Sequence, residues 1–346
     1  MPFTAADPIV RVVERYDAAI VGGGIIGLAS AWRARQRGLR VCVLERGRPG
    51  FGATRAAAGV LSPDPETEGF TALARRSAEL WPSFAAELGE VGYTRCGSLV
   101  LVFDDSPLEK DGEWVDGAAC RALEPGIASD CVGGVLLRDD AQVDPRRVTE
   151  ALVAALGDAL RANADVVELA PDGVELADGA RIEADRVVLA AGAWSSKRLA
   201  RRLPVRPVKG QTLRLRGPLP ATRIIRSEHV YVVPRASGET VIGATVEEAG
   251  FDETVTDEAT AALLREAIRA VPAVAELELV EAVAGLRPGT PDDGPLIGEW
   301  EGLIVAGGHY RNGILLAPIT ADAVAALLAG AAPPPEILQF DPRRFE

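Results

Sequence analysis

The pattern of apolar and polar residues near the N-terminus predicts a strand, a glycine turn, a helix and a second strand. Residues 17–21 form a short apolar run, and the sequence GGGIIG follows at 22–27. A stretch with helical periodicity then reaches Arg37, Gly38 closes it, and a second apolar run covers 39–44. Two strands joined through a helix form a βαβ unit, and the glycine turn stands between its first strand and its helix.

This glycine turn indicates a dinucleotide site. Gly22 permits the tight turn, Gly24 lets the backbone approach a pyrophosphate, and Gly27 allows the helix to pack closely on the strand. The helix N-terminus then faces the anion. Glu45 ends the second strand, where its carboxylate can accept hydrogen bonds from both ribose hydroxyls and disfavours a 2′-phosphate. The alternative is a glycine turn that binds nothing, and the βαβ context argues against it.

Two further apolar runs end in glycine and predict additional buried strands. The run at 186–190 leads into AGAWS, and the run at 303–308 leads into HYRNG at 309–313. An apolar helix follows, which we expect to start near Ile314 and to bend at Pro318, where a backbone donor is missing. Ligands of doubly wound sheets gather at the carboxyl ends of strands. One nucleotide-binding domain assembled from discontinuous segments is therefore predicted.

Between these runs the pattern changes to alternation of apolar and polar residues. Residues 93–103 and 203–246 alternate in this way, which is typical of antiparallel strands, and a helix over 257–270 and a strand over 277–283 follow. The predicted fold class is α/β with an α+β second domain: a Rossmann-like domain with an inserted antiparallel-sheet substrate domain. The expected boundaries are 1–85, 146–203 and 286–346 for the nucleotide-binding domain, and 86–145 and 204–285 for the substrate-binding domain.

Composition and charge narrow the class of protein. The chain has 346 residues, which favours two domains or one domain with a large insertion, and its formal net charge is −13. Such a charge repels phosphate backbones, so nucleic acid is not an expected partner. No apolar stretch approaches the roughly 20 residues of a membrane span. The first 17 residues lack the pattern of a signal peptide, so we expect a cytoplasmic protein.

The chemistry-bearing residues are few. The four cysteines, at 42, 96, 120 and 131, have no C-x-x-C spacing, and the chain has only two histidines. Neither a disulfide framework nor a metal site is predicted, and no Ser-His-Asp order or paired-carboxylate motif is present. The chemistry is therefore expected to come from the bound nucleotide.

Six motifs carry a family resemblance over nearly the whole chain. They are GGGIIG at 22–27, LERG at 44–47, GATRAAAGVLSP at 52–63, HVYVVPR at 229–235, GLRPGTPDDGPLIG at 285–298 and GGHYRNGILLAP at 307–318. Together they resemble the glycine oxidase branch of the D-amino-acid oxidase family of FAD-dependent enzymes, which supplies dehydroglycine for the thiazole of thiamine in many bacteria. The chain departs from many glycine oxidases at Val60, where they carry methionine, which affects the shape of the pocket.

The resemblance implies the reaction. It implies a non-covalent FAD, because the chain has no cysteine after residue 131, where sarcosine oxidases tether their flavin. It implies hydride transfer from the substrate Cα to flavin N5 without a protein acid or base, and reoxidation of the flavin by O₂ with release of H₂O₂. The expected substrates are glycine, sarcosine and small D-amino acids, and the expected assembly is a homotetramer.

The resemblance also implies roles for particular residues. Arg287 takes the position of the arginine that pairs bidentately with the substrate carboxylate, and Tyr231 donates a hydrogen bond to the same carboxylate. Arg311 lies at the rim of the pocket and adds positive field. His229, two residues from Tyr231, shares its strand face and is the fourth substrate-binding candidate. His309 orders the glycine loop, and amides at the start of the last helix stabilise reduced flavin.

The residues expected to bind FAD are Gly22, Gly24, Ile25, Ile26, Gly27, Glu45, Arg46, Thr54, Arg55, Ala57, Ala58, Gly59, Val60, Val166, Ala191, Gly192, Trp194, Arg287, His309, Tyr310, Arg311, Asn312, Gly313 and Ile314. Three alternatives stay open at this point. One is a D-amino-acid or sarcosine oxidase, the second is a dehydrogenase of the same fold that passes electrons to a quinone or a carrier protein, and the third is a non-catalytic flavoprotein subunit.

Overall fold

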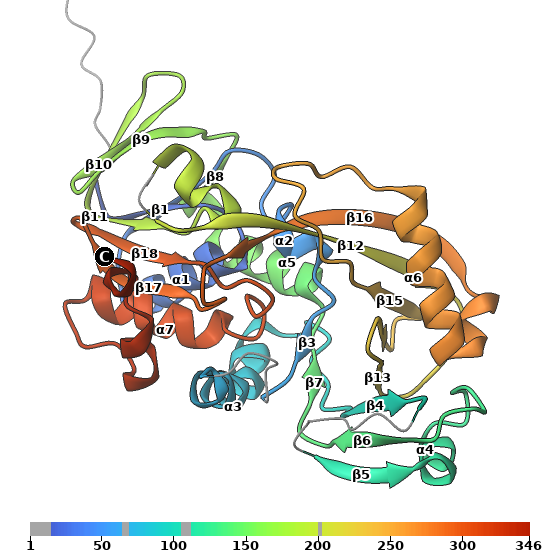
Figure 1. Ribbon diagram of the computed structural model, residues 1–346. Coiled ribbons are helices and arrows are strands. Elements are labelled where there is room, and N and C mark those ends of the chain that lie inside the picture. The colour runs from blue at the N-terminus through green and yellow to red at the C-terminus, as the bar shows by residue number, and fades with distance from the viewer. Residues whose placement is uncertain (1–14, 64–68, 105–111, 200–202) are drawn as a thin grey trace, which may run out of the picture.

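The computed structural model describes residues 15–63, 69–104, 112–199 and 203–346, so the segment from which the absence of a leader is inferred lies mostly outside them. Two eight-stranded sheets dominate this part of the chain. Figure 1 shows the first sheet beside a bundle of helices and the second sheet extending away from it. The mixed α/β fold class predicted from the sequence is confirmed.

The first sheet contains the predicted βαβ unit. Strand β1 (Arg15–Val21), helix α1 (Ile25–Gln36) and strand β2 (Val41–Glu45) follow one another, and β1 is parallel to both β2 and β11 (Arg181–Leu189). Strand β18 (Leu303–Gly307) is parallel to β11. The three glycine-terminated runs therefore end at the same edge of one sheet, as expected. The other strands of this sheet are β8 (Leu160–Ala162), β9 (Val166–Ala170), β10 (Gly173–Leu176) and β17 (Leu296–Trp300).

The two faces of this sheet are covered differently. Ala18 and Ile20 of β1 belong to the core under the helices, whereas Ala19 and Val21 face the β9–β10 hairpin. This alternation follows from the two-residue period of a strand, and both faces are buried, as is usual for parallel strands. The helices on the first face are α1, α3 (Thr71–Leu88), α5 (Pro145–Leu156) and α7 (Ala317–Leu328).

The second sheet has the order β16-β12-β15-β14-β13-β4-β6-β5, and all its pairs are antiparallel except β13 with β4. Its strands are β4 (Ser98–Val102), β5 (Glu113–Asp116), β6 (Gly133–Leu137), β12 (Arg206–Arg216), β13 (Ile224–Arg226), β14 (Tyr231–Pro234), β15 (Glu239–Gly243) and β16 (Glu278–Gly289). Helices α4 (Gly117–Leu123) and α6 (Asp257–Ala270) cover one face. Its opposite face turns toward the short helix α2 (Ala53–Ala56).

Strands β12 and β16 pair along almost their whole length, and Figure 1 shows them running from the region of the first sheet into the second. The two-residue strands β3 (Val60–Leu61) and β7 (Ala141–Gln142) form a further link. The strands of each sheet fall in the segments expected for each domain, except that β16 crosses the boundary expected between 285 and 286. The boundaries themselves stay a prediction.

One expected element differs from the observed one. Helix α7 begins at Ala317, three residues later than expected, and residues 313–316 form a turn before it. Pro318 lies in the first turn of α7, where the amide it lacks would have no partner within the helix. It therefore starts the helix instead of bending it.

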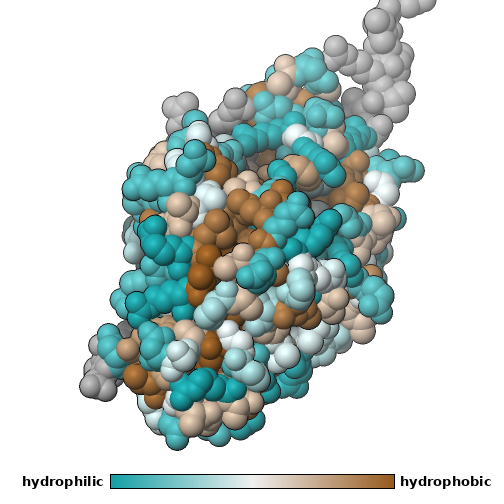
Figure 2. Space-filling view, turned by 90° about the vertical axis from the view of Figure 1, so that its right-hand side faces the viewer, coloured by the Kyte–Doolittle hydropathy of each residue, from teal (hydrophilic) through white to brown (hydrophobic). Residues whose placement is uncertain are grey.

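Polar side chains cover most of the face shown in Figure 2, and a narrow band of apolar residues crosses its middle. Among the helices in the described ranges, none combines the length and the apolar character that crossing a bilayer requires.

Candidate functional site

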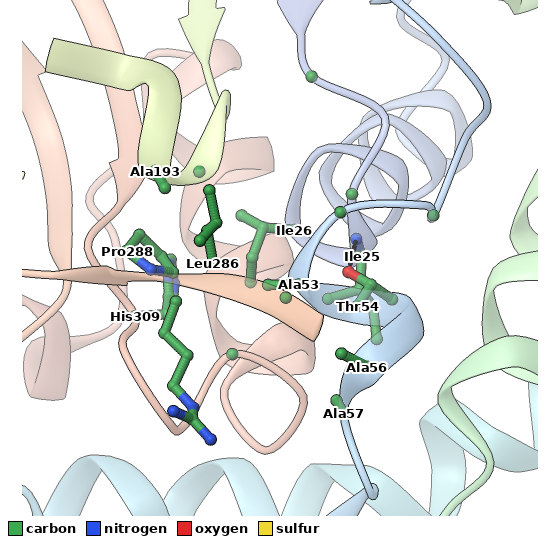
Figure 3. A pocket seen from close by; sticks show the side chains of 18 of the residues that line it. Ile25, Ile26, Ala53, Thr54, Ala56, Ala57, Ala193, Leu286, Pro288 and His309 are labelled. Carbon is green, nitrogen blue, oxygen red and sulfur yellow. Dashed lines mark hydrogen bonds between the residues drawn. The ribbon is translucent and has the colours of Figure 1, made fainter. Parts of the chain in front are cut away.

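A cavity of about 470 Å³ opens where the parallel strands of the first sheet end. Side chains from α1, α2, β16 and the loop after β18 come together around it, among them Ile25, Thr54, Leu286 and His309 (Figure 3). The expected cofactor residues that line it are Gly22, Gly24, Ile25, Ile26, Glu45, Arg46, Thr54, Ala57, Ala58, Gly59, Val60, Val166, Ala191, Gly192, Trp194, Arg287, His309, Tyr310, Arg311, Asn312, Gly313 and Ile314.

The glycine turn packs as its spacing predicts. Gly22 has φ +115°, and a Cβ there would overlap the Ala190 carbonyl. A Cβ at Gly27 would overlap the carbonyl oxygen of Gly22, so Gly27 serves the packing of α1 on β1 and does not line the cavity. Gly24 caps α1, and a Cβ there would meet Thr54 Oγ1 at 3.6 Å, an ordinary contact distance. The first turn of α1 is therefore free to face an anion.

Glu45 is held at the end of β2 by two backbone amides. Its Oε2 accepts from the Gly23 amide at 2.7 Å, and its Oε1 accepts from the Gly47 amide at 2.8 Å. A carboxylate has about four acceptor positions, so two bonds of this kind fix its orientation and leave acceptor capacity. Because Glu45 also lines the cavity, this capacity is available to a ribose hydroxyl.

Residues 52–60, called the wall segment below, form one side of the cavity, and α2 lies within it. The Ile25 amide at the start of α1 donates to Thr54 Oγ1 at 3.1 Å, which ties the segment to the glycine turn. Arg55, an expected cofactor residue, does not line the cavity. Its guanidinium pairs with Glu281 and lies over the ring of Phe51 at 4.6 Å from the centroid.

A layer of cations and aromatic rings lies at the cavity, where the expected residues Arg46 and Trp194 are joined by Lys197, Phe251 and Glu253, which the sequence did not indicate. The Arg46 guanidinium lies 4.1 Å from the centroid of the Trp194 ring, and Phe251 packs on the same ring. Lys197 lies over Phe251, and Glu253 lines the cavity nearby. Phe251 and Glu253 belong to the loop between β15 and α6, which carries no motif, so no local pattern could have identified them.

The structure brings Tyr231, Arg287 and Arg311 to the same cavity. Arg287 Nη1 donates to the Thr245 carbonyl at 3.0 Å, and a Cβ at Gly210 would overlap its guanidinium. Burial lowers the pKa of Arg287, Tyr231 opposes this shift and Arg311 adds to it, which places all three groups within electrostatic reach of one another. Arg311 is exposed, as expected of a residue at the rim.

Arg226 is a further cation of this cavity that the sequence analysis missed. It lies opposite Tyr231 in the β13–β14 pair, and directly opposite residues in antiparallel strands point to the same face. Its guanidinium lies 3.7 Å from the Asp140 carboxylate, which also accepts from the hydroxyls of Ser62 and Ser98. The pairing with Tyr231 is the signal that could have found Arg226, once the strand register was known.

His229 does not occupy the expected position. Strand β14 begins at Tyr231, and His229 lies before it in the turn that follows β13, with 61% of its side chain exposed. Its ring lies 3.7 Å from the carboxylate of Glu228, and it is not among the residues that line the cavity. The expectation that His229 shares a strand face with Tyr231 is therefore wrong, because the extended strand ends two residues short of it.

His309 orders the loop at the end of β18. It is 2% exposed, and its Nε2 lies 3.0 Å from Thr320 Oγ1 of α7. The Asn312 amide donates to its carbonyl, and the neighbouring Tyr310 amide donates to the Pro288 carbonyl at 2.9 Å. Burial lowers the pKa of His309 to about 3, so its imidazole is neutral at physiological pH and is a poor proton acceptor.

This burial predicts a pH dependence of stability. Between pH 3 and 6.5 the unfolded chain binds a proton at His309 that the folded chain does not, so the free energy of unfolding falls as the pH falls through this window. The slope for one proton is about 1.4 kcal/mol per pH unit. We expect the free energy of unfolding, measured with urea, to fall between pH 7 and pH 5 by roughly 2 kcal/mol less in His309→Gln than in wild type. His229→Gln, in an exposed turn, is the control, and equal losses in His309→Gln and wild type would contradict the prediction.

Comparisons with known proteins agree with this geometry. A family model described as "FAD dependent oxidoreductase" (DAO) matches residues 17–327. The bifunctional protein ThiO/ThiG of Trichormus variabilis is 38% identical over 95% of this chain, and the chain spans about half of that relative, 55%. The glycine oxidase of Geobacillus kaustophilus is 33% identical over 92% of this chain and 94% of the relative. The crystal structure of glycine oxidase from that organism matches with a TM-score of 0.89 and 32% identity, covering 95% of this chain and 98% of the other.

The family model covers well over half of the sequence, and the chain therefore belongs to the DAO family of FAD dependent oxidoreductases.

Proposed function

We propose that this enzyme oxidises glycine, and with it sarcosine or small D-amino acids, to the imine that hydrolyses to glyoxylate or the matching oxo acid. The observation that carries the proposal is that Tyr231, Arg287 and Arg311 converge on the cavity that also holds the dinucleotide turn. The similarity to a glycine oxidase over nearly the full length of both chains supports it.

The residues present fit the FAD that the family uses. The glycine turn lines the cavity at residues 22 and 24, and Glu45 offers a fixed carboxylate at the end of β2. We infer that the flavin is bound without a covalent link, because none of the four cysteines, all of which the structure describes, lines the cavity. When bound, FAD supplies a hydride acceptor that dioxygen reoxidises with release of H₂O₂.

The protein's own contribution is to bind and orient the amino acid. The planar fork of Arg287 suits two parallel hydrogen bonds to a carboxylate, and Tyr231 adds a hydroxyl donor beside it. Arg226 and Arg311 raise the positive potential at this end of the cavity, which favours an anionic substrate group. Neutral His309 holds its loop and moves no proton, in keeping with a reaction that needs positioning more than acid or base catalysis.

The wider setting belongs to the same proposal. The imine of glycine is a reactive product, and the resemblance to the thiamine-type enzymes supports delivery of this product to thiazole formation. We also propose a homotetramer in the cytoplasm, for which the support is the family resemblance alone. Light scattering of the purified holoenzyme measures the mass of the assembly.

An anaerobic titration tests the reaction. We expect glycine, sarcosine, D-alanine and D-proline to bleach the flavin absorbance to different extents, and an amine without a carboxylate to leave it unchanged, because Arg287 and Tyr231 would lack their partner. Under air, H₂O₂ should appear in a one-to-one ratio with oxidised amine. Bleaching without H₂O₂ would support a dehydrogenase, and a flavin that no amine bleaches would support a non-catalytic flavoprotein.

A conservative substitution tests the carboxylate anchor. Arg287→Lys keeps the charge and loses the bidentate fork, so kcat/KM for glycine should fall at least about 30-fold at equal flavin occupancy. Arg206→Lys, an exposed arginine on β12, is the matched control and should stay near wild type. A value for Arg287→Lys within about threefold of wild type would mean that another group, with Arg311 the first candidate, holds the carboxylate.

A charge reversal tests the ribose contact. Glu45→Arg removes the acceptor that the Gly23 and Gly47 amides orient, and each hydrogen bond to a charged group contributes about 1.5–3 kcal/mol. The Kd of the apoprotein for FAD should rise at least about tenfold, as measured by quenching of flavin fluorescence. Glu175→Arg, at an exposed position of β10, controls for the added charge. Purification of Glu45→Arg with a full complement of flavin would exclude a ribose contact.

A further inference from the structure

Side-chain donors from the second sheet and from α5 hold the backbone of the wall segment. The Ala58 carbonyl accepts a hydrogen bond from Arg235 Nη2 at 2.9 Å, and the Ala56 carbonyl accepts from Thr212 Oγ1 at 2.9 Å. The Arg55 carbonyl accepts from two further guanidiniums at 3.4 Å, those of Arg146 and Arg214. Three carbonyls of the segment are thus held by side chains of other elements, and of these donors Thr212 itself lines the cavity whereas the three arginines do not.

Arg235 has the largest set of contacts in this group. Its side chain is 6% exposed, it does not line the cavity, and its Nη1 also approaches the Val143 carbonyl at 3.3 Å. Its guanidinium pairs with Asp144 at 3.1 Å and with Glu239 at 3.4 Å. One buried cation therefore joins the wall segment, the chain before α5 and the second sheet. A lysine could not reach these partners together, because its ammonium lacks the planar fork.

The bond from Arg235 sets the direction of a peptide group. In a trans peptide the C=O and N–H groups point in opposite directions. Because Arg235 holds the Ala58 carbonyl on the side away from the cavity, the amide of Gly59 is turned toward the cavity side. Gly59 has φ +80°, and a Cβ there would overlap the Val143 carbonyl, so its glycine is required for this conformation.

Strand β14 connects this contact with the substrate end. Tyr231 and Val233 alternate with residues that face α6 and so face the wall segment, and Arg235, the residue directly after β14, reaches the same segment through its bond to the Ala58 carbonyl. Val233 packs in one cluster with Ala58. One short strand and the residue that follows it therefore connect Tyr231, which lines the cavity, with Arg235, which does not line it and holds the wall segment.

We propose that Arg235 is a positioning residue for FAD: it fixes the wall segment from behind so that the amide side of the segment faces the cofactor. The role goes beyond the oxidation of glycine and does not depend on which amine is the substrate. It depends only on the binding of FAD, which can be measured without any amine.

The test uses apoprotein prepared from the full-length chain. We expect the Kd for FAD to rise at least about tenfold in Arg235→Lys and further in Arg235→Met, because the ammonium keeps one of the carbonyl contacts and the thioether keeps none. The visible absorbance maxima of the bound flavin should shift in both variants, since the polar groups that face it have moved.

A matched control separates positioning from stability. Arg223, the residue before β13, donates to the 2%-exposed carboxylate of Glu124 at the end of α4, and its side-chain bonds are all to residues outside the wall segment, so Arg223→Met removes a buried ion pair of the same domain without touching the wall. We expect its thermal stability to fall while its Kd for FAD and its flavin spectrum stay at wild-type values. If Arg235→Lys fails to fold, the isosteric variant Thr212→Val takes its place. It removes the bond to the Ala56 carbonyl and should also raise the Kd for FAD. A folded Arg235→Lys, or Thr212→Val in its place, with the Kd and spectrum of wild type would overturn the proposal.

Discussion

The close backbone contact between β1 and α1 is the constraint on which the rest of the site depends. A side chain at Gly27 would overlap the Gly22 carbonyl, and a side chain at Gly22 would overlap the carbonyl of Ala190, the residue directly after the neighbouring strand β11. The helix can therefore begin directly above the ends of two parallel strands. Its first amides, the Glu45 carboxylate and the Thr54 hydroxyl all gather at this point, and interiors are packed too densely for the helix to move outward and keep these contacts.

Sequence reasoning succeeded where the signal was local or carried by a motif. The glycine turn, Glu45 and the strand that ends before Ala191 follow from spacing along one stretch of chain. Tyr231 and Arg287, named through the family resemblance, line the cavity, and their roles toward the substrate stay a prediction. Other features depend on tertiary structure. Arg226 is recognised only from the pairing of β13 with β14, and His229 was misplaced because alternation does not say where a strand stops. The donors behind the wall segment come from strands far apart in sequence, and no single window contains them.

The charge of the whole chain says little about the charge of its cavity. The formal net charge is −13, which argued against phosphate backbones as partners, yet the cavity is lined by the guanidiniums of Arg287 and Arg311, with Arg226 nearby in a pair with Asp140. Screening in physiological salt limits exposed charges to a range of about 8 Å, so surface carboxylates do not cancel these arginines.

Behind the wall segment, Arg214 and Arg235 are buried and each is paired with carboxylates. Loss of one partner of such a pair costs about 3–5 kcal/mol, which explains why the pairs are shared and redundant.

Because the cofactor supplies the chemistry, the protein must mainly hold the parts of the site at the right distances from one another. A pair of cross-strand glycines does so at the centre of the site. Gly210 of β12 lies opposite Gly285 of β16 in the long ladder that joins the two sheets. A side chain at Gly210 would overlap the Arg287 guanidinium, and one at Gly285 would come within 2.7 Å of the Ala56 side chain. One glycine thus makes room for Arg287, the proposed substrate anchor, and the other for the wall segment. A misplacement of about 1 Å can cost roughly 100-fold in rate, so a methyl group at either position would separate parts that have to act together.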